Sequence, residues 1–325
     1  MFMDKLTGGE RILRCVIRKE NAGGPLISFL GARFPYHSPE EWARLAAAGA
    51  VRLNGDIPAP DRALAEGDIV QYFLADAPEP EVNTAVTVLY EDRDIVLVDK
   101  PGDLPAHPAG RYFKNTLWWL LRERLSVAEP SIINRLDRET SGVTLVAKNA
   151  RAALACRRQF SERGVIKKYT AITEGAFERA VHARGYIVPA KTSAIRKKRQ
   201  FEPSTEAGPA PGREAEWAET IFTPVKSAGG LSVLEARPHT GRLHQIRATL
   251  LFLGCPVVGD KMYGLDELIF LRMIEGRMTP EDPVKMRIAR QALHAGELIF
   301  RHPADGRHMA VTAPLPPDMR GLTGR

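Results

Sequence analysis

The sequence predicts an α+β protein in which a small N-terminal domain precedes a larger one, built on a mostly antiparallel mixed sheet with flanking helices. The chain has 325 residues, and at about 150 residues per domain this length suggests two domains. An acidic, proline-rich stretch at residues 75–82 lacks periodicity and is typical of a linker. Beyond it, strand and hairpin patterns outnumber helical ones. We therefore expect domains at residues 1–76 and 84–325, joined by a linker at residues 77–83.

The N-terminal domain is predicted to contain two short helices and a small sheet. Apolar residues recur at helical spacing across residues 25–34, which predicts the first helix. Ser38, followed by Pro39 and by Glu41 three positions after the serine, is typical of a helix start, and this second helix should end at Gly49. The expected strands cover residues 51–55, which end in an Asn-Gly turn, and residues 69–73.

The larger domain is predicted to combine several hairpins with two helices. Polar or glycine-containing turns separate its apolar runs, as is usual in antiparallel sheets. Residues 201–213 are polar and rich in proline and glycine, so we expect a surface loop there. The expected strands are residues 86–90, 95–99, 142–147, 165–173, 216–223, 231–236, 292–300 and 308–313, and the expected helices are residues 150–163 and 240–253.

Composition and charge narrow the classes of function. The net charge of +7, from 46 basic and 39 acidic residues, favours a polyanionic partner such as nucleic acid. The three cysteines are far apart and form no CxxC pair, which suits a reducing cytoplasm. No apolar run reaches the roughly 18 residues of a membrane span, and the first 15 residues lack the apolar block of a secretory signal. The histidines form no HExxH motif, so we expect no metal site.

One loop, which runs from Asn134 to Gly142 with the sequence NRLDRETSG, carries the strongest indication of chemistry. Arg135 and Arg138 flank Asp137, and nearby cations hold a carboxylate in its ionised form. An ionised carboxylate in a sheltered pocket can act as a nucleophile or as a base. From these residues alone, the other interpretation is a structural network of arginine and aspartate around a polar turn.

This loop resembles the HRLDRETSG motif of the RluA family of RNA pseudouridine synthases at eight of nine positions, with Asn134 where the family usually has histidine. Other stretches resemble motifs of the same family and occur in the family's order between residues 86 and 313. They are Tyr90 to Pro108 (YED, VDKP and LPAHP), Lys167 to Tyr169 (KKY), Pro238 to Arg247 (PHTGRLHQIR), Gly259 to Gly264 (GDKMYG) and Leu293 to Pro303 (LHA, then HP).

The resemblance implies isomerisation of uridine to pseudouridine within RNA, without a cofactor or a metal. It implies that Asp137 is the catalytic carboxylate, that Tyr169 stacks on the target base and that Arg247 pairs with Asp137. Without the resemblance, Tyr169 could be a core tyrosine and Arg247 a phosphate-binding arginine. The substrate-binding residues that it further implies are Arg135, Arg138, Arg242, His244 and Leu293.

The N-terminal domain resembles an S4-type RNA-binding module at residues 49–55 (GAVRLNG) and 64–70 (LAEGDIV), which implies RNA contact there. A packing domain is the alternative, because its cations are few. Such a module favours structured RNA, ribosomal rather than transfer RNA, and we expect a monomer. A basic run is expected to hold the RNA backbone, unless it is only a solvated face. Its residues are Lys191, Arg196, Lys197, Lys198 and Arg199.

Two other functions stay open at this stage. The first is a catalytically inactive relative that binds or chaperones RNA. The second is a carboxylate-based hydrolase of small glycosides, which would need a second carboxylate about 5–9.5 Å from Asp137. Glu139 is the only near candidate for that carboxylate in the sequence.

Overall fold

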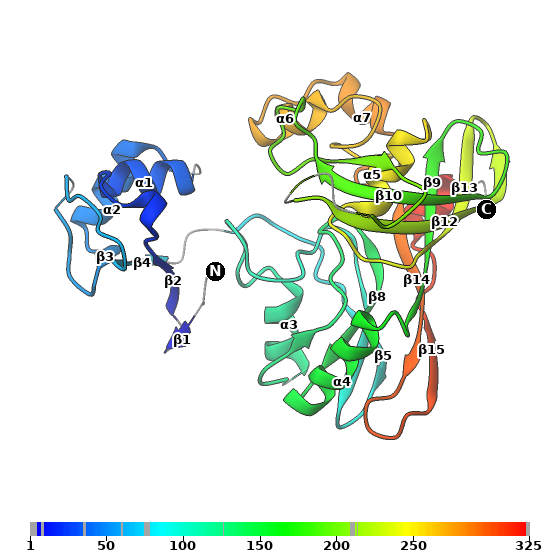
Figure 1. Ribbon diagram of the computed structural model, residues 1–325, viewed down its shortest axis with the longest axis horizontal. Coiled ribbons are helices and arrows are strands. Elements are labelled where there is room, and N and C mark those ends of the chain that lie inside the picture. The colour runs from blue at the N-terminus through cyan, green and yellow to red at the C-terminus, as the bar shows by residue number, and fades with distance from the viewer. Residues whose placement is uncertain are drawn as a thin grey trace. The chain divides into compact units, whose positions relative to one another are not determined.

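The computed structural model describes residues 5–7, 10–34, 37–59, 61–74, 79–125, 127–208, 212 and 214–322 (Figure 1). The chain divides into two compact units, residues 1–79 and 80–325, and each has its own hydrophobic core. Of the predicted linker at residues 77–83, residues 77 and 78 lie outside the described part of the chain.

The N-terminal unit is a four-stranded antiparallel sheet with the strand order β1-β2-β4-β3, which packs against two helices. Trp42, Leu26 and Leu30 are fully buried in its core. The predicted helix start at Ser38 is confirmed, because its Oγ accepts a hydrogen bond from the backbone N–H of Glu41. The elements are β1 (Lys5–Thr7), β2 (Glu10–Val16), the 3-10 helix η1 (Lys19–Asn21), α1 (Leu26–Arg33), α2 (Pro39–Ala47), β3 (Val51–Leu53) and β4 (Ile69–Leu74).

A hydrogen-bonded pair of side chains ties the turn after β3 to the start of β4. The Asn54 side chain donates to Asp68 Oδ1 over 2.8 Å and accepts from the backbone N–H of Ile69 over 2.8 Å. Asp68 in turn accepts from the backbone N–H of Ala65. The two short motifs that resemble an S4-type module therefore meet in one local structure.

The larger unit is an 11-stranded sheet, in the order β11-β10-β12-β13-β9-β14-β8-β6-β5, with β15 paired to β14 and β7 to β8. Among the described strands, β14 and β8 form the one parallel pair. The predicted fold class, α+β with a mostly antiparallel sheet, is confirmed. The strands are β5 (Thr87–Glu91), β6 (Ile95–Lys100), β7 (Ser131–Ile132), β8 (Ser141–Ala147), β9 (Ile166–Glu174), β10 (Val181–Pro189), β11 (Arg199–Pro203), β12 (Glu216–Ala228), β13 (Leu231–Pro238), β14 (Leu293–Arg301) and β15 (His308–Thr312).

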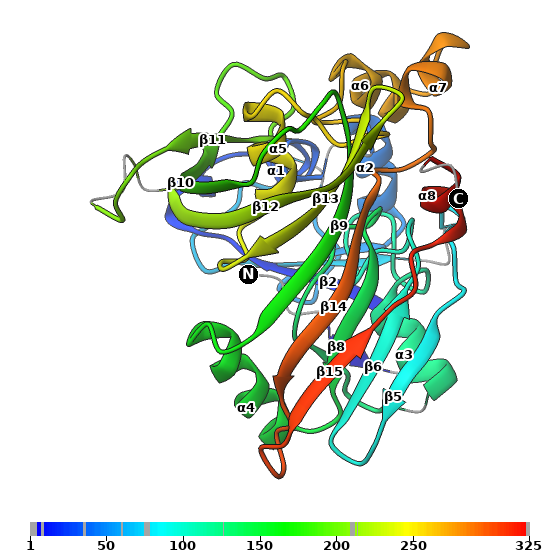
Figure 2. The ribbon, with the colours of Figure 1, turned by 90° about the vertical axis from the view of Figure 1, so that its right-hand side faces the viewer.

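Helices pack on both faces of the sheet around β6 and β8 (Figure 2). Ile95 and Leu97 of β6 belong to the core that includes Cys156 of α4, whereas Val96 and Val98 belong to the core that includes α3. Successive residues of a strand point to opposite faces, so a strand covered on both sides is apolar at every position. The helices are α3 (Leu117–Leu125), α4 (Ala150–Ser161), α5 (Gln245–Phe252), α6 (Leu268–Ile274), α7 (Glu281–Met286) and α8 (Pro317–Leu322).

Two predicted boundaries are wrong. The helix predicted at residues 240–253 begins only at Gln245, because the Gln245 side chain accepts hydrogen bonds from the Thr240 hydroxyl and from the Arg242 N–H, which holds the preceding residues in a turn. The loop predicted at residues 201–213 begins with strand, because Phe201 pairs with Ile187 of β10 and is buried.

Candidate active site

A cleft of about 600 Å³ opens beside the loop that precedes β8. The loop before β8, one face of β9, the turn before α5 and the start of β14 contribute its walls. Seven residues that the sequence predicted for the site line this one cleft. They are Arg135, Asp137, Tyr169, Arg242, His244, Arg247 and Leu293.

The loop that carries Asp137 is held by its own polar side chains. The Asn134 side chain donates to the carbonyl of Val143 over 2.9 Å and accepts from the N–H of Leu145 over 2.7 Å. Asparagine at this position therefore fixes the loop to β8 without a titratable group. Gly142 has φ +116°, and a Cβ there would lie 2.2 Å from the carbonyl oxygen of Ala295. Glycine thus permits the close contact between β8 and β14 next to Asp137.

Arg247 connects the partly exposed Asp137 carboxylate to the fully buried carboxylate of Asp260. Its Nη1 donates to Asp137 Oδ2 over 2.7 Å. Its Nε and Nη2 donate to the two oxygens of Asp260 over 2.6 and 2.8 Å, a two-pronged contact that fixes the guanidinium plane. The guanidinium also lies over the ring of Tyr263, 4.8 Å from its centre. The Asp137 carboxylate therefore has a rigid partner.

The surroundings of Asp137 favour its ionised form. Burial opposes ionisation, but the Arg247 charge and hydrogen bond outweigh burial and lower the pKa of the carboxyl below its ordinary value. The buried Lys100 ammonium donates to the carbonyls of Pro101, Leu104 and Arg138. Burial lowers the pKa of Lys100 to about 7, and the Asp137 carboxylate opposes that change.

Tyr169 and Leu293 form apolar parts of the same cleft. On β9, Tyr169 pairs with Ala236 of β13 and with Ala295 of β14, so its flanking neighbours are small. Burial and the Asp137 carboxylate raise the pKa of its phenol, which therefore stays neutral at physiological pH. A flat ring beside an anion in a cleft is suited to a planar, uncharged ligand.

Comparisons with known proteins agree with this geometry. Residues 94–251 match the family described as RNA pseudouridylate synthase. Ribosomal large subunit pseudouridine synthase D of Zymomonas mobilis is 30% identical over 264 residues, which cover 77% of this chain and 77% of the relative.

The chain belongs to the RNA pseudouridylate synthase family. The mitochondrial tRNA pseudouridine(32) synthase of Saccharomyces cerevisiae is 30% identical over 75% of this chain and 51% of its own length. The structure of human RNA pseudouridylate synthase domain containing 4 aligns with a TM-score of 0.56 and 26% identity, covering 72% of this chain and 90% of the human one. The protein is thus a pseudouridine synthase, an isomerase, with relatives named for ribosomal and for transfer RNA.

Arg138 is the predicted substrate-binding residue that does not line the synthase cleft. Its guanidinium contacts the Tyr112 hydroxyl over 2.6 Å and Asp103 Oδ1 over 3.3 Å, beside a second cavity. Glu139, the candidate second carboxylate of a glycoside hydrolase, also lines that second cavity and pairs with Lys261. The geometry for two carboxylates facing one substrate is therefore not present at this loop.

The basic run that was predicted to bind the RNA backbone contains both exposed cations and a cation that pairs with a carboxylate. Lys191, Arg196 and Lys197 are exposed, whereas Lys198 pairs with Glu267 and has an 11% exposed side chain. Arg199 begins β11, and its backbone N–H donates to the Tyr263 hydroxyl. The described residues contain no cluster of three or more potential metal ligands, and none of their helices is long and apolar enough to cross a membrane.

Two residues that support the site, Asp260 and Tyr263, are absent from the set of site residues that the sequence predicted. Asp260 orients Arg247, and Tyr263 covers the guanidinium and lies 2.9 Å from His244 Nδ1. Burial, together with Arg247, lowers the pKa of His244 to about 4, so its imidazole is neutral. Asp260 and Tyr263 belong to the GDKMYG motif. Asp260 lies between a glycine and a lysine there, and these neighbours do not indicate that its partner is an arginine elsewhere in the chain.

Proposed function

We propose that this synthase converts specific uridines in structured RNA to pseudouridine, with Asp137 as the catalytic carboxylate. The observation that supports this most is the arrangement of Asp137 in the cleft. Its carboxylate is held ionised by the buried Arg247, and the ring of Tyr169 and the side chain of Leu293 line the same space. A flipped uracil needs such a combination of a fixed anion and a flat apolar surface.

The reaction breaks the bond between uracil N1 and ribose C1′, turns the base and forms a bond between C5 and C1′. The proton that leaves C5 balances the one that N1 gains, so no oxidant or metal enters the stoichiometry. The Asp137 carboxylate could begin this reaction in three ways: it could attack the ribose, attack the base or remove a proton from the ribose. Each way needs a carboxylate that is ionised and held in place. In each route Arg247 keeps the Asp137 carboxylate ionised and oriented.

Ribosomal RNA is the substrate that we favour over transfer RNA. The chain covers 77% of the Zymomonas mobilis enzyme named for the ribosomal large subunit, against 51% of the Saccharomyces cerevisiae enzyme named for tRNA. Such a target places the enzyme in the cytoplasm, where the three free cysteines would stay reduced. We expect it to act as a monomer.

Mapping of pseudouridine in ribosomal and transfer RNA, from cells with and without the gene, tests this function. We expect at least one uridine of ribosomal RNA to lose its modification in the deletion strain and to regain it when purified enzyme is added to that RNA. Identical maps from the two strains would contradict the proposal and would favour an inactive relative that only binds RNA.

The N-terminal unit is proposed to be the S4-like module that contacts RNA. Arg52 and Arg62 are exposed on it, and the Arg52 guanidinium lies 5.0 Å from the centre of the Phe73 ring. The Asn54–Asp68 pair fixes the turn next to Arg52. This arrangement offers fixed positive charge to phosphates.

Replacement of Arg52 and Arg62 by glutamine in the full chain is therefore expected to weaken RNA binding. The rate of pseudouridine formation within the bound complex should not change. Each lost phosphate contact should make the slope of log Kd against log salt shallower by about 0.7 to 0.9. Filter binding at several salt concentrations measures the slope, with Arg158→Gln on α4 as the matched control, since Arg158 is an exposed arginine of the other unit. An unchanged slope would show that this unit does not hold phosphates.

A further inference from the structure

Glu139 is close to Asp137 in the chain but points into a different space. The backbone N–H of Thr140 donates to the Asp137 carbonyl over 3.1 Å, so Asp137, Glu139 and Thr140 share one tight turn. The Glu139 side chain lines the second cavity, of about 720 Å³, rather than the cleft. One tight turn therefore carries Asp137 into the cleft and Glu139 into the second cavity.

Glu139 and Lys261 form a largely buried ion pair. Lys261 Nζ lies 2.7 Å from Glu139 Oε1, and the two side chains are only 10% and 14% exposed. Lys261 also donates to the carbonyl of Ala289, while Glu139 Oε2 accepts from the backbone N–H of Gln291 over 3.2 Å. Burial of two charges costs about as much as their attraction returns, so such a pair contributes little net stability. Its clearest effect is to fix geometry.

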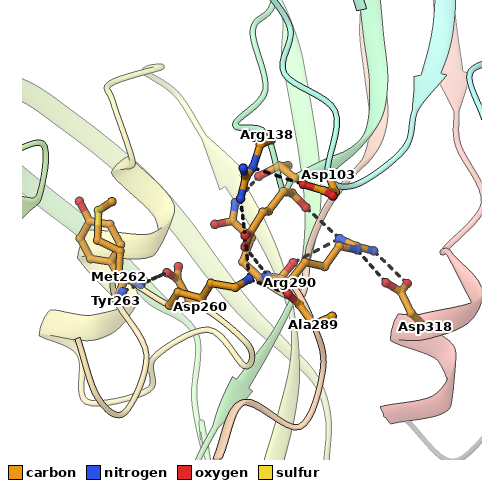
Figure 3. Close-up of polar contacts among 12 residues, drawn as sticks. Asp103, Arg138, Asp260, Met262, Tyr263, Ala289, Arg290 and Asp318 are labelled. Atoms are coloured by element: carbon orange, nitrogen blue, oxygen red, sulfur yellow. Dashed lines mark hydrogen bonds and ion pairs between the residues drawn. The ribbon is translucent and has the colours of Figure 1, made fainter. Parts of the chain in front are cut away.

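The neighbour of Lys261 in the chain holds the catalytic carboxylate from the other side. Asp260 makes the two-pronged contact with Arg247, and Arg247 donates to Asp137. The adjacent residues Asp260 and Lys261 thus reach Asp137 by two routes, one through Arg247 and one through Glu139. Figure 3 shows Asp260 near Ala289 and Arg290, and it shows the Arg290 side chain directed at Asp318 on α8.

The loop that carries both residues is itself closely fixed. Gly259 has φ +72°, and a Cβ there would lie 2.2 Å from the Arg290 carbonyl oxygen, so the two backbones are in direct contact. The Arg290 guanidinium forks onto Asp318 over 2.7 and 2.9 Å, and its Nη1 donates to the Glu139 carbonyl over 3.0 Å. The loop can therefore serve as a rigid support for the turn.

We propose that Glu139 and Lys261 are a positioning pair, which holds the turn so that the Asp137 carboxylate stays aligned with both Arg247 and the target nucleotide. The pair touches no reacting atom. This role rests on the proposed catalytic role of Asp137, and it identifies the residues that position the Asp137 carboxylate.

A double-mutant cycle on the full-length enzyme tests the pair, with Lys261→Met, Glu139→Gln and the double variant. The substrate is the RNA of the deletion strain, in single turnover with enzyme in excess. We expect each single variant to lower the maximal rate constant by at least about tenfold, since a displacement of about 1 Å at a reacting group can cost about 100-fold. The double variant should be no slower than the slower single variant, because each single change already removes the same ion pair.

The half-saturating enzyme concentration separates positioning from loss of folded protein. A smaller folded fraction would raise that concentration and leave the maximal rate constant unchanged. We expect instead that the maximal rate constant falls and that the half-saturating concentration stays at the wild-type value. Arg158→Met, which removes the exposed Arg158–Glu162 pair, is the control and should match wild type. The positioning role of the pair would be contradicted if Lys261→Met had the wild-type rate constant. It would also be contradicted if the two single effects multiplied in the double variant. Wild-type enzyme that forms no pseudouridine would instead overturn the proposed function.

Discussion

Replacement of Asp137 by asparagine is expected to lower the rate of pseudouridine formation by about 10³-fold or more, because the base or nucleophile of the reaction is lost. The side chain keeps its shape, and its carbonyl oxygen can still accept the hydrogen bond from Arg247. The fold should therefore persist. Single-turnover assays on RNA from the deletion strain, together with a thermal melt of the variant, measure both effects.

The matched control for this substitution is Asp305→Asn. Asp305 is an exposed aspartate in the turn between β14 and β15, away from the residues that line the cleft. We expect its activity to equal that of wild type. An Asp137→Asn enzyme that is fully active would remove the carboxylate from the mechanism.

Replacement of Arg247 by methionine is expected to affect both stability and activity. It leaves Asp137 and Asp260 without their shared cation, and removal of one partner of a buried ion pair costs about 3–5 kcal/mol of unfolding free energy. The Arg247 charge lowers the pKa of Asp137 in the folded enzyme, so without it burial raises that pKa. The carboxylate would then take up a proton at a higher pH, and the acid limb of the rate–pH profile should move towards neutral pH.

Urea unfolding and the rate–pH profile measure these two effects separately. Arg242→Met is the control, since Arg242 lines the same cleft but bonds to Glu216 and to the Trp217 carbonyl rather than to Asp137. Its acid limb should stay at the wild-type position. An unmoved acid limb in Arg247→Met would mean that Arg247 does not set the ionisation of Asp137.

Features that depend on neighbours in the chain are those that the sequence predicted well. Ser38 caps α2 through a contact three residues away. The hairpin of β14 and β15 forms across Asp305 and Gly306 as expected. Both depend on local backbone preferences, which short patterns record. The predicted pair of Arg247 and Asp137 is also present, and here the resemblance supplied what spacing cannot.

Features that depend on the direction and partners of individual side chains were missed. Arg138 and Asp137 are adjacent, yet Asp137 lines the cleft and Arg138 the second cavity, because successive side chains of the tight turn at residues 137–140 point in different directions. Asp260 was not expected, since its partner Arg247 is brought to it only by the packing of α5. The start of α5 was misplaced because a side-chain contact of Gln245 competes with helical hydrogen bonds. Of these interactions, the contact between Arg247 and Asp260 is tertiary. The contacts of Gln245 and the turn that begins at Asp137 are local, but they depend on side-chain geometry that a residue pattern does not record.

The position of β14 has a consequence for synthesis of the enzyme in the cell. It lies between β9 and β8, which do not pair with each other, and it brings Leu293 to the cleft. A ribosome must therefore translate β14 (Leu293–Arg301) before the two halves of the sheet can join. We therefore expect nascent enzyme to be inactive until β14 has been made, and an N-terminal fragment that ends before β14 to leave RNA unmodified.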